Sequence, residues 1–550
     1  MKRSLLSMTL TAAMLLPSCA ITNHRPTPPP ASQAPASFTI LAVNDVYRIN
    51  GVADSEGRGQ IGGLARLRTL RRSLEAEDPG LLVLHAGDLL TPSLLSLMYE
   101  GRQMVDVLNR LDGDPQAFDP RLFVTFGNHE FDIRDASELD RRIDESQFRW
   151  LGTDLTFSSQ NGQPVVDGDN LLRTLIVESN GLRIGLFSLS IDMNDPHYVQ
   201  FADPLETARQ ATAELRQQGA EVVVALTHLR LSQDIEILQA LGDQGPDLHI
   251  GGHEHSQQHE MVNGRYVLKA DADAVSATVV KVTPRPDGPP RVDFRYEDLG
   301  PADPSPDPQV QERVDWWLAK HAREFCAGQQ PPEPPDCLDE KLGVAGVTLV
   351  AEETMIRRYE TNFGNWVADL MKAQYPRAQV AVVGSGTLRM NQDIPKGGDF
   401  TRRDLEALLP FPTRVRLLKI TGADLQKAVS HSVETWTGNG WWLQVSGIAF
   451  RHDPKEERAY DLTLLTDKGP RPVQPEEEIW LAANDYIAGG RDGYAMLGPQ
   501  AEVPGAPSPN LEDLIKQALA AAGPEGIKPQ KEGRICNTQE ADQPCLAVVR

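Results

Sequence analysis

The sequence predicts an α/β fold divided into at least two domains, and three observations support this. In the first half, short apolar runs rich in β-branched residues alternate with helical stretches, which is typical of buried strands joined by helices. A different set of motifs begins after about residue 340. A chain of 550 residues is long enough for two or three domains.

Four apolar runs in the first half are expected to be strands. They span residues 38–43, 81–84, 122–126 and 221–226. Helical stretches lie between them, among them residues 61–77 and 204–218. The strands, being short and apolar throughout, are expected to be buried on both faces.

Polar side chains able to bind metals follow these runs and one further run that ends at Gly251. Because ligands bind beyond the carboxyl ends of strands in α/β layers, we expect these side chains to converge in one cleft. A set of unrelated strand-end caps is the alternative, but it does not explain five such pieces in order. The candidates are Asp45, Asp88, Asn128, His129, Asp132, His228, His253 and His255.

These residue types suit a hydrolytic site with two metal ions. Two divalent ions about 3.5–4 Å apart can clamp the attacking and leaving oxygens of a phosphoryl displacement, and bound water then ionises near neutral pH. Asp88 is the natural bridging carboxylate. Neutral imidazoles favour Mn, Zn, Co or Fe over Ca.

The motifs resemble the calcineurin-like metallophosphoesterases, and more narrowly the 5′-nucleotidase family, over about residues 38–500. The resemblance implies a four-layered α/β/β/α sandwich followed by a second α/β substrate-binding domain. It places the first metal on Asp45, Asp88 and His255. It places the second on Asp88, Asn128, His228 and His253. His129 and Asp132 would be the catalytic pair, with His129 stabilising charge on the phosphoryl oxygens and Asp132 orienting its ring.

One position departs from the family at the first metal. The family has a ligating histidine where this chain has Tyr47. Two hypotheses stay open: Tyr47 ligates and shifts the metal preference, or it points away and leaves a weaker site.

The second half resembles the family's C-terminal substrate domain. On that match Arg357 and Arg389 contact the phosphate side, Phe411 and Tyr486 stack on the base, and Asp492 binds the ribose. Core packing of the rings and surface ion pairs of the arginines are the alternatives. The family's base-contacting asparagines are replaced in the runs 384–389 and 411–413.

We expect a catalytic domain over residues 38–300, a connection with a helix over 301–341, a substrate domain over 342–525 and a tail over 526–550. The resemblance implies hydrolysis of 5′-nucleotides to nucleoside and phosphate by a metal-bound water. A 2′,3′-cyclic-nucleotide or UDP-sugar phosphodiesterase, and a catalytically impaired nucleotide-binding surface protein, are the alternatives.

The N-terminus predicts export. A charged start and a short apolar run form a signal peptide over residues 1–18, and the run 16–19 resembles a bacterial lipobox that would lipidate Cys19. Plain secretion is the alternative. Residues 19–37 are expected to be a disordered tether. We therefore expect the periplasmic side of a bacterial membrane or the cell surface, with Cys19 as the only membrane attachment.

The other four cysteines are even in number, which in an exported chain suggests disulfides. Close spacing favours the pairs Cys326–Cys337 and Cys536–Cys545, although three pairings are possible. The formal net charge of −23 makes the chain a poor binder of nucleic acid polymers. We expect a monomer that binds a small nucleotide.

Overall fold

The computed structural model describes residues 36–54, 59–160, 162–193, 197–434, 440–539 and 545–546. The predicted signal peptide, Cys19 and nearly all of the predicted tether lie outside these residues. Within the described part, none of the helices has the length and apolar character that crossing a membrane requires.

The domain expected to be catalytic contains two large mixed sheets. The seven-stranded sheet has the order β10-β6-β5-β4-β1-β18-β19, and the six-stranded sheet has the order β11-β12-β14-β15-β17-β16. The strands of the first are β1 (Phe38–Val43), β4 (Leu82–His85), β5 (Leu122–Thr125), β6 (Arg149–Leu151), β10 (Leu171–Leu172), β18 (Ser276–Thr283) and β19 (Arg291–Asp298). Those of the second are β11 (Thr174–Ser179), β12 (Leu182–Ser190), β14 (Val222–His228), β15 (Leu248–Gly251), β16 (Gln258–Val262) and β17 (Arg265–Lys269).

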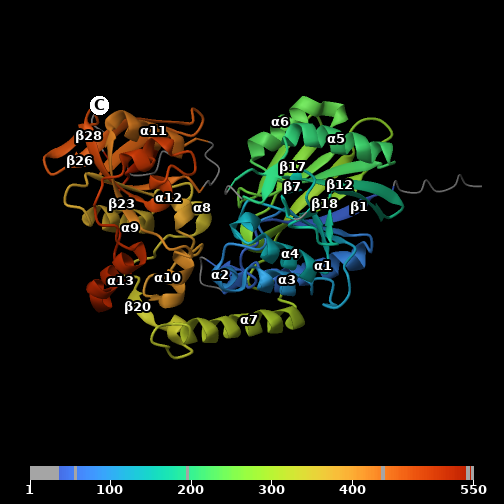
Figure 1. The fold of residues 1–550 in the computed structure, drawn as a ribbon, viewed down its shortest axis with the longest axis horizontal. Helices are drawn as coiled ribbons and strands as arrows, with labels where there is room; N and C mark the ends of the chain where they lie inside the picture. Colours follow the sequence, from blue (N-terminus) through green and yellow to red (C-terminus); the bar gives the residue numbers. More distant parts are fainter. Residues whose placement is uncertain are drawn as a thin grey trace, which may run out of the picture. The chain divides into compact units, whose positions relative to one another are not determined.

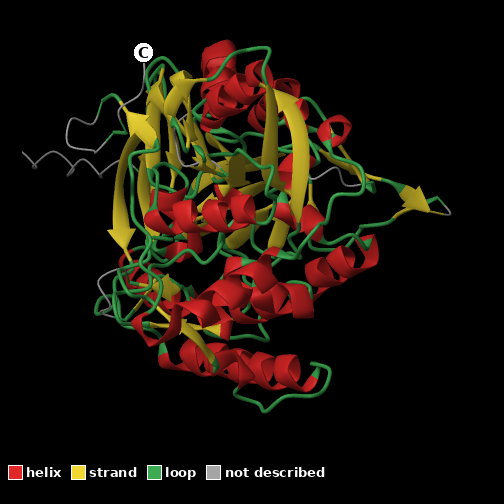
Figure 2. Cartoon of the chain, turned by 90° about the vertical axis from the view of Figure 1, so that its left-hand side faces the viewer, coloured by secondary structure: helices red, strands yellow, loops and turns green. Residues whose placement is uncertain are grey.

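Helices cover the outer faces of both sheets, as Figure 1 shows. In Figure 2, which is coloured by secondary structure, strands lie with helices above and below them. Helices on the outer face of the seven-stranded sheet are α1 (Leu64–Glu77), α2 (Leu94–Tyr99), α3 (Arg102–Leu108) and α4 (Ala136–Glu145), and those on the outer face of the six-stranded sheet are α5 (Pro204–Gln217) and α6 (Leu231–Leu241). Along β1, Ile40 joins the core between the sheets, whereas its neighbour Leu41 faces the helices. This alternation is the period of a strand buried on both faces, and it confirms the four-layered α/β/β/α sandwich.

The local predictions hold with small shifts of boundary. All four apolar runs form strands, and β14 extends to His228. The helix expected from residue 61 begins at Leu64. Helix α5 begins as expected, because Pro204 occupies its first turn and the Asp203 side chain accepts a hydrogen bond from the Glu206 backbone.

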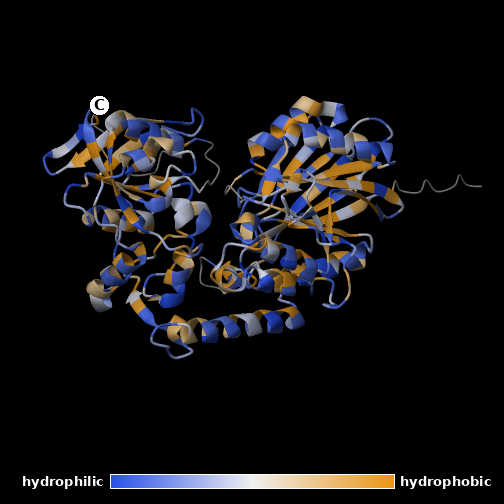
Figure 3. Cartoon of the chain, viewed as in Figure 1, coloured by the Kyte–Doolittle hydropathy of each residue, from blue (hydrophilic) through white to orange (hydrophobic). Residues whose placement is uncertain are grey.

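The predicted connecting helix is α7 (Pro308–Ala327), and it packs against the catalytic domain. Val310, Val314 and Trp317 belong to the same core as α1 and α3. In Figure 3 apolar and polar residues alternate along this helix, as expected of one that buries a single face. The helix is therefore part of the outer helical layer as well as a connector.

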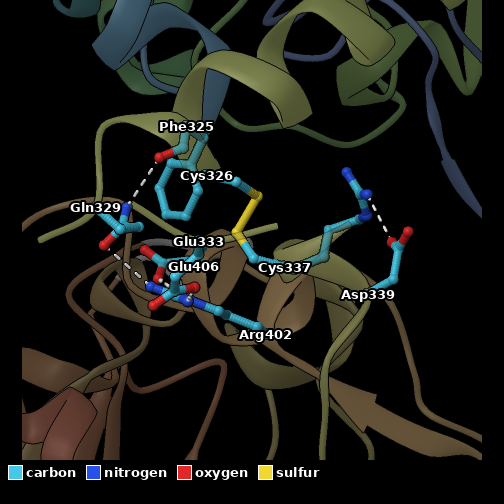
Figure 4. Close-up of a disulfide and its surroundings, with 9 residues drawn as sticks. Phe325, Cys326, Gln329, Glu333, Cys337, Asp339, Arg402 and Glu406 are labelled. Carbon is cyan, nitrogen blue, oxygen red and sulfur yellow. Dashed lines mark hydrogen bonds and ion pairs between the residues drawn. A yellow bond between two sulfur atoms is a disulfide. The ribbon is translucent and has the colours of Figure 1, made fainter. Parts of the chain in front are cut away.

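A disulfide closes the segment that follows α7 (Figure 4). Cys326 at the end of α7 is bonded to Cys337, as predicted. Arg402 of the next domain pairs with Glu333 inside this loop and donates to Gln329 Oε1 at 3.1 Å. The loop is thus fastened to the first turn of α10 (Arg402–Leu408).

The C-terminal domain contains two four-stranded sheets, ordered β23-β28-β21-β24 and β27-β26-β25-β29. Their strands are β21 (Val380–Gly384), β23 (Val415–Thr421), β24 (Leu443–Ser446), β25 (Ile448–Asp453), β26 (Arg458–Thr466), β27 (Gly469–Pro472), β28 (Glu478–Asn484) and β29 (Ile535–Asn537). The helices are α8 (Glu353–Ile356), α9 (Asn362–Ala373), α10, α11 (Gly422–Ser432), α12 (Asp485–Ala488) and α13 (Leu511–Ala522).

The expected boundary at residue 525 is too early. Strand β29 pairs in parallel with β25, and the Glu360 carboxylate accepts hydrogen bonds from the backbone of Glu532 and Ile535. The segment 526–537 is therefore part of the C-terminal domain. The second predicted disulfide, Cys536–Cys545, is also present.

Candidate active site

The polar strand ends meet at one place, but they come from both sheets. Asp45, Asp88 and Asn128 follow β1, β4 and β5 of the seven-stranded sheet, whereas His228 ends β14 and His253 follows β15 of the other sheet. Oxygen and nitrogen atoms of Asp45, Asp88 and His228 all lie within 4.8 Å of one another. The facing sheets thus each supply part of one cluster.

Backbone groups fix the orientation of these side chains. Asp45 Oδ2 accepts a hydrogen bond from the His253 backbone N–H at 2.9 Å, and Asp88 Oδ1 accepts one from the His129 backbone N–H at 2.8 Å. Asn128, which precedes His129, is buried. His228 Nδ1 lies 2.7 Å from the Ala86 carbonyl, which can only accept. His228 Nε2 is therefore the nitrogen that faces the cluster, and it lies 3.3 Å from Asp88 Oδ2.

The backbone at the site is strained. Asp45, Asp88, His253 and His255 all have φ between 53° and 88°, a region that non-glycine residues rarely adopt. Such strain persists only where surrounding structure enforces it, and it concentrates at functional sites. A Cβ at Gly127 would lie 2.1 Å from Asp88 Oδ1, so only glycine lets this loop approach the carboxylate.

The cluster holds buried negative charge that needs a positive partner. Burial alone would raise the pKa of Asp45, but His255 and His228 hold it well below its usual value. Burial alone would lower the pKa of His228, but Asp88 and Asp45 raise it to about 10. Burial, together with the neighbouring His228, lowers the pKa of His253 well below its usual value, so that ring is neutral. The carboxylates thus favour a cation among them, and carboxylates with imidazoles are a suitable donor set for divalent transition metals.

Tyr47 does not point away from the site, so that hypothesis is wrong. Its hydroxyl lies 2.8 Å from His255 Nε2, 3.0 Å from Asp88 Oδ2 and 3.2 Å from Asp45 Oδ1. Burial, followed by Asp88 and Asp45, raises the pKa of Tyr47 well above its usual value. The phenol therefore occupies the ligand cluster itself.

The predicted catalytic pair is assembled beside the cluster. His129 Nδ1 lies 2.7 Å from Asp132 Oδ2 within a single 3₁₀ turn, His129–Asp132. Thr91 Oγ1 donates to the same carboxylate oxygen at 3.2 Å. On the other side of the ring, His129 Nε2 lies 3.4 Å from Arg389 Nη2 of the C-terminal domain.

Both predicted arginines reach this region from the C-terminal domain, and neither is a plain surface residue. Arg357 is 7% exposed, pairs with Glu353 at 2.7 Å, and has Nη1 3.5 Å from His255 Nδ1. Arg389 holds its own loop through Nε, which donates to the Gly386 carbonyl at 2.8 Å. Arg357 therefore lies beside the predicted metal ligand His255, and Arg389 lies beside the predicted catalytic residue His129.

The predicted aromatic pair is exposed, which excludes core packing for both rings. Phe411 is 37% exposed and Tyr486 is 45% exposed. The Arg389 guanidinium lies 5.9 Å from the centre of the Phe411 ring, and the Tyr486 hydroxyl donates to Asp492 Oδ1 at 3.1 Å. Burial raises the pKa of Asp492, against the opposing effects of Tyr486 and Arg389. These residues thus form a polar and aromatic surface next to Arg389.

Three supporting residues were not singled out from the sequence. Glu130 accepts four backbone hydrogen bonds, from residues 88, 89, 90 and 127, and so fixes the loop that carries Asp88. Buried Lys269 donates to the carbonyls of Leu229 and Gly252, which adjoin His228 and His253. Glu353 accepts from His255. Of these, only Glu130 carried a sequence signal, because it lies between the candidate residues His129 and Asp132.

Comparison with known proteins matches two family models to the two domains. The calcineurin-like phosphoesterase model matches residues 38–257, and the model of the 5′-nucleotidase C-terminal domain matches residues 343–499. A snake venom 5′-nucleotidase of Gloydius brevicauda is 26% identical over 510 residues, which cover 85% of this chain and 84% of the relative.

Two solved structures share the fold over nearly the whole chain. A 5′-nucleotidase precursor of Thermus thermophilus matches with a TM-score of 0.73 and 23% identity, covering 92% of this chain and 100% of the other. The sulfate thiohydrolase SoxB of Thermus thermophilus matches with a TM-score of 0.68 and 17% identity, covering 92% and 97%. At these identities the likeness concerns the fold alone.

The sandwich and its cluster of carboxylates and imidazoles are those of a calcineurin-like, metal-dependent phosphoric ester hydrolase. The chain thus carries a calcineurin-like phosphoesterase domain followed by a 5′-nucleotidase C-terminal domain, and over 85% of its length it is similar to a 5′-nucleotidase.

Proposed function

We propose that this protein hydrolyses 5′-nucleotides to a nucleoside and phosphate. One observation carries the proposal: the His129–Asp132 pair lies between the carboxylate and imidazole cluster and Arg389, with the exposed aromatic pair next to that arginine. A phosphoryl group at the cluster and a base on the rings would use both ends of this arrangement.

Two divalent ions fit the residues present. Asp45, Asp88 and His255 would hold one ion, and Asp88, Asn128, His228 and His253 would hold the other, with Mn, Zn, Co and Fe as suitable metals. When bound, such ions polarise the phosphoryl group and lower the pKa of water toward about 7. Tyr47 lies among the atoms of the first set, so we propose that it is a ligand there.

His129 would act on the phosphoryl oxygens. The Asp132 carboxylate accepts from Nδ1, so Nε2 is directed away from it toward Arg389. A protonated Nε2 would donate to an oxygen on which charge develops, and Arg389 would add a second donor. Removing one such donor typically lowers kcat by about 10²–10³-fold.

Nucleoside recognition would fall to the exposed surface. Phe411 and Tyr486 are exposed aromatic rings, and Asp492, already hydrogen-bonded to Tyr486, can accept from sugar hydroxyls. Stacking of a base on a ring is worth about 1–3 kcal/mol and tolerates different bases. Since the family's base-contacting asparagines are replaced here, we expect weak discrimination among bases.

The test is phosphate release by residues 38–550 reconstituted in turn with Mn, Zn, Co and Fe. Substrates are AMP, UMP, GMP, ADP, UDP-glucose and 2′,3′-cyclic AMP. Turnover of the monophosphates above the others supports the proposal. Preference for UDP-glucose or the cyclic nucleotide makes the protein a diesterase. Nucleotide binding without turnover under every metal makes it a binding protein.

We also propose export to the periplasmic side of a bacterial membrane or to the cell surface, with a lipid on Cys19. The two disulfides support an oxidising compartment. Fractionation tests the anchor: the wild type should sediment with membranes, and a Cys19→Ala variant that sediments equally would remove the lipid from the account.

A further inference from the structure

A carboxylate of the C-terminal domain holds a predicted metal ligand of the catalytic domain. Glu353 Oε1, in the first turn of α8, lies 2.6 Å from Nδ1 of His255. Glu353 is 6% exposed and His255 is 7% exposed. A buried hydrogen bond between the two domains therefore lies directly behind the first set of metal ligands.

The surrounding groups decide which ring nitrogen carries the proton. A carboxylate only accepts, and the Arg357 guanidinium, 3.5 Å from the same nitrogen, only donates. The short contact with Glu353 therefore requires a proton on Nδ1. His255 Nε2 is then the nitrogen that faces the cluster, where Asp45 Oδ1 lies 3.2 Å away, and it is the nitrogen that a metal ion would use.

Glu353 is itself held by its own domain. Arg357 Nη2 lies 2.7 Å from Oε1, and Asn391 Nδ2 donates to Oε2 at 3.1 Å. Both neighbours belong to the C-terminal domain. The position of this carboxylate therefore follows the C-terminal domain, whereas the imidazole that it contacts follows the catalytic domain.

Taking the proposed two-metal function as its basis, we propose that Glu353 is a positioning residue that makes the first metal site depend on contact between the two domains. A carboxylate behind a ligating imidazole fixes its tautomer and ring orientation, and its loss typically weakens metal binding about 10–100-fold. Here that carboxylate is removed whenever the domains separate. By linkage, an ion at the first site must favour the domain contact to the same degree.

Two other contacts between the domains involve no proposed metal ligand. Arg358 Nη2 donates to Ser256 Oγ at 2.8 Å, which holds the domains together without reaching a ligand. Arg389 approaches His129, which is not among the proposed ligands. Glu353 differs from both because it joins domain contact to the geometry of a ligating imidazole.

A neighbouring carboxylate provides a matched control. Glu352 precedes Glu353, and its side chain accepts from the Thr354 backbone at 3.0 Å to cap α8. Glu352→Gln changes the same charge one residue away and keeps an oxygen for the cap. Any general effect of lost charge on this helix should appear in both variants.

The experiment is equilibrium dialysis of the purified full chain against Mn²⁺, without substrate, for the wild type, Glu353→Gln and Glu352→Gln. We expect Glu353→Gln to weaken one of two ions about 10–100-fold and to leave the other within about twofold. Glu352→Gln should bind both ions as the wild type does. Wild-type affinity for both ions in Glu353→Gln overturns the proposal. A wild type that binds fewer than two ions contradicts the two-metal function itself.

A measurement on the wild type covers the case in which Glu353→Gln does not fold. Adding Mn²⁺ should slow amide hydrogen exchange of the peptide that contains α8, which is in the C-terminal domain, because the bound ion favours contact with Glu353. Exchange in that peptide that is unaffected by saturating Mn²⁺ overturns the proposal.

Discussion

Lys269 is expected to be essential for the stability of the catalytic domain. It is the last residue of β17, it is 1% exposed, and its ammonium lies 2.6 Å from Glu254 Oε2 and 3.0 Å from Asp234 Oδ2. The same ammonium donates to the carbonyls of Leu229 and Gly252 at 2.6 and 2.9 Å. One cation therefore compensates two buried carboxylates and two carbonyls at the loops that carry His228 and His253.

Replacing Lys269 by Met keeps most of the side-chain volume and removes the charge. Two carboxylates then stay buried without a cation, and breaking a buried ion pair in this way costs about 3–5 kcal/mol. Urea unfolding at pH 7.5, followed by circular dichroism, should show this loss as a lower midpoint at an unchanged slope.

A triple variant separates the charge from the packing. Lys269→Met with Asp234→Asn and Glu254→Gln removes all three charges, so that no buried carboxylate is left without its cation. We expect it to recover at least half of the lost stability. A single variant within about 1 kcal/mol of the wild type would refute the reasoning, since the carboxylates would then not depend on Lys269.

Three further predictions follow from single positions. Burial raises the pKa of Asp154 to about 7, so the folded protein keeps a proton that the unfolded chain loses above about pH 4. The free energy of unfolding should therefore fall as pH rises from 4 to 7, by at most about 4 kcal/mol. Asp154→Asn should remove this pH dependence when urea unfolding is compared at pH 4.5 and 7.5. Tyr47→Phe should lose the first ion in metal analysis, whereas full metal content would exclude ligation by the phenol. Phe411→Ala and Tyr486→Ala should each raise KM for AMP about 5–150-fold, with kcat less affected, because stacking contributes about 1–3 kcal/mol. An unchanged KM in both variants would place the base elsewhere.

The strands and the convergence of the polar strand ends could be predicted because both signals are local. A polar residue follows each apolar run within a few positions, so the sequence alone predicts that Asp45, Asp88 and His228 stand at carboxyl ends of strands. It does not show that β14 belongs to a second sheet facing the first. That assignment depends on which apolar faces pack together. The sequence of β14 has the same apolar pattern as the strands of the first sheet, because all of them are buried on both faces.

The supporting contacts could not be predicted because they join distant segments. Glu353 and His255 are 98 residues apart and lie in different domains. Lys269 is the last residue of a strand, where the sequence does not distinguish a buried lysine from an exposed one. Because lysine is seldom fully buried unless it is paired, exposure is the expected state. The direction of Tyr47 depends on His255 and Asp88, which only the fold brings to its hydroxyl. Strand β29 is three residues long and too short for a periodic signal.

The most direct test of the account compares phosphate release from AMP by the wild type and by His129→Ala, with metal content measured in the same samples. His129 is not among the proposed metal ligands, so both proteins should carry two ions. With equal metal, we predict that kcat falls about 10²–10³-fold in the variant. Equal turnover at equal metal content would contradict the catalytic role of the His129–Asp132 pair, and with it the assignment of this site.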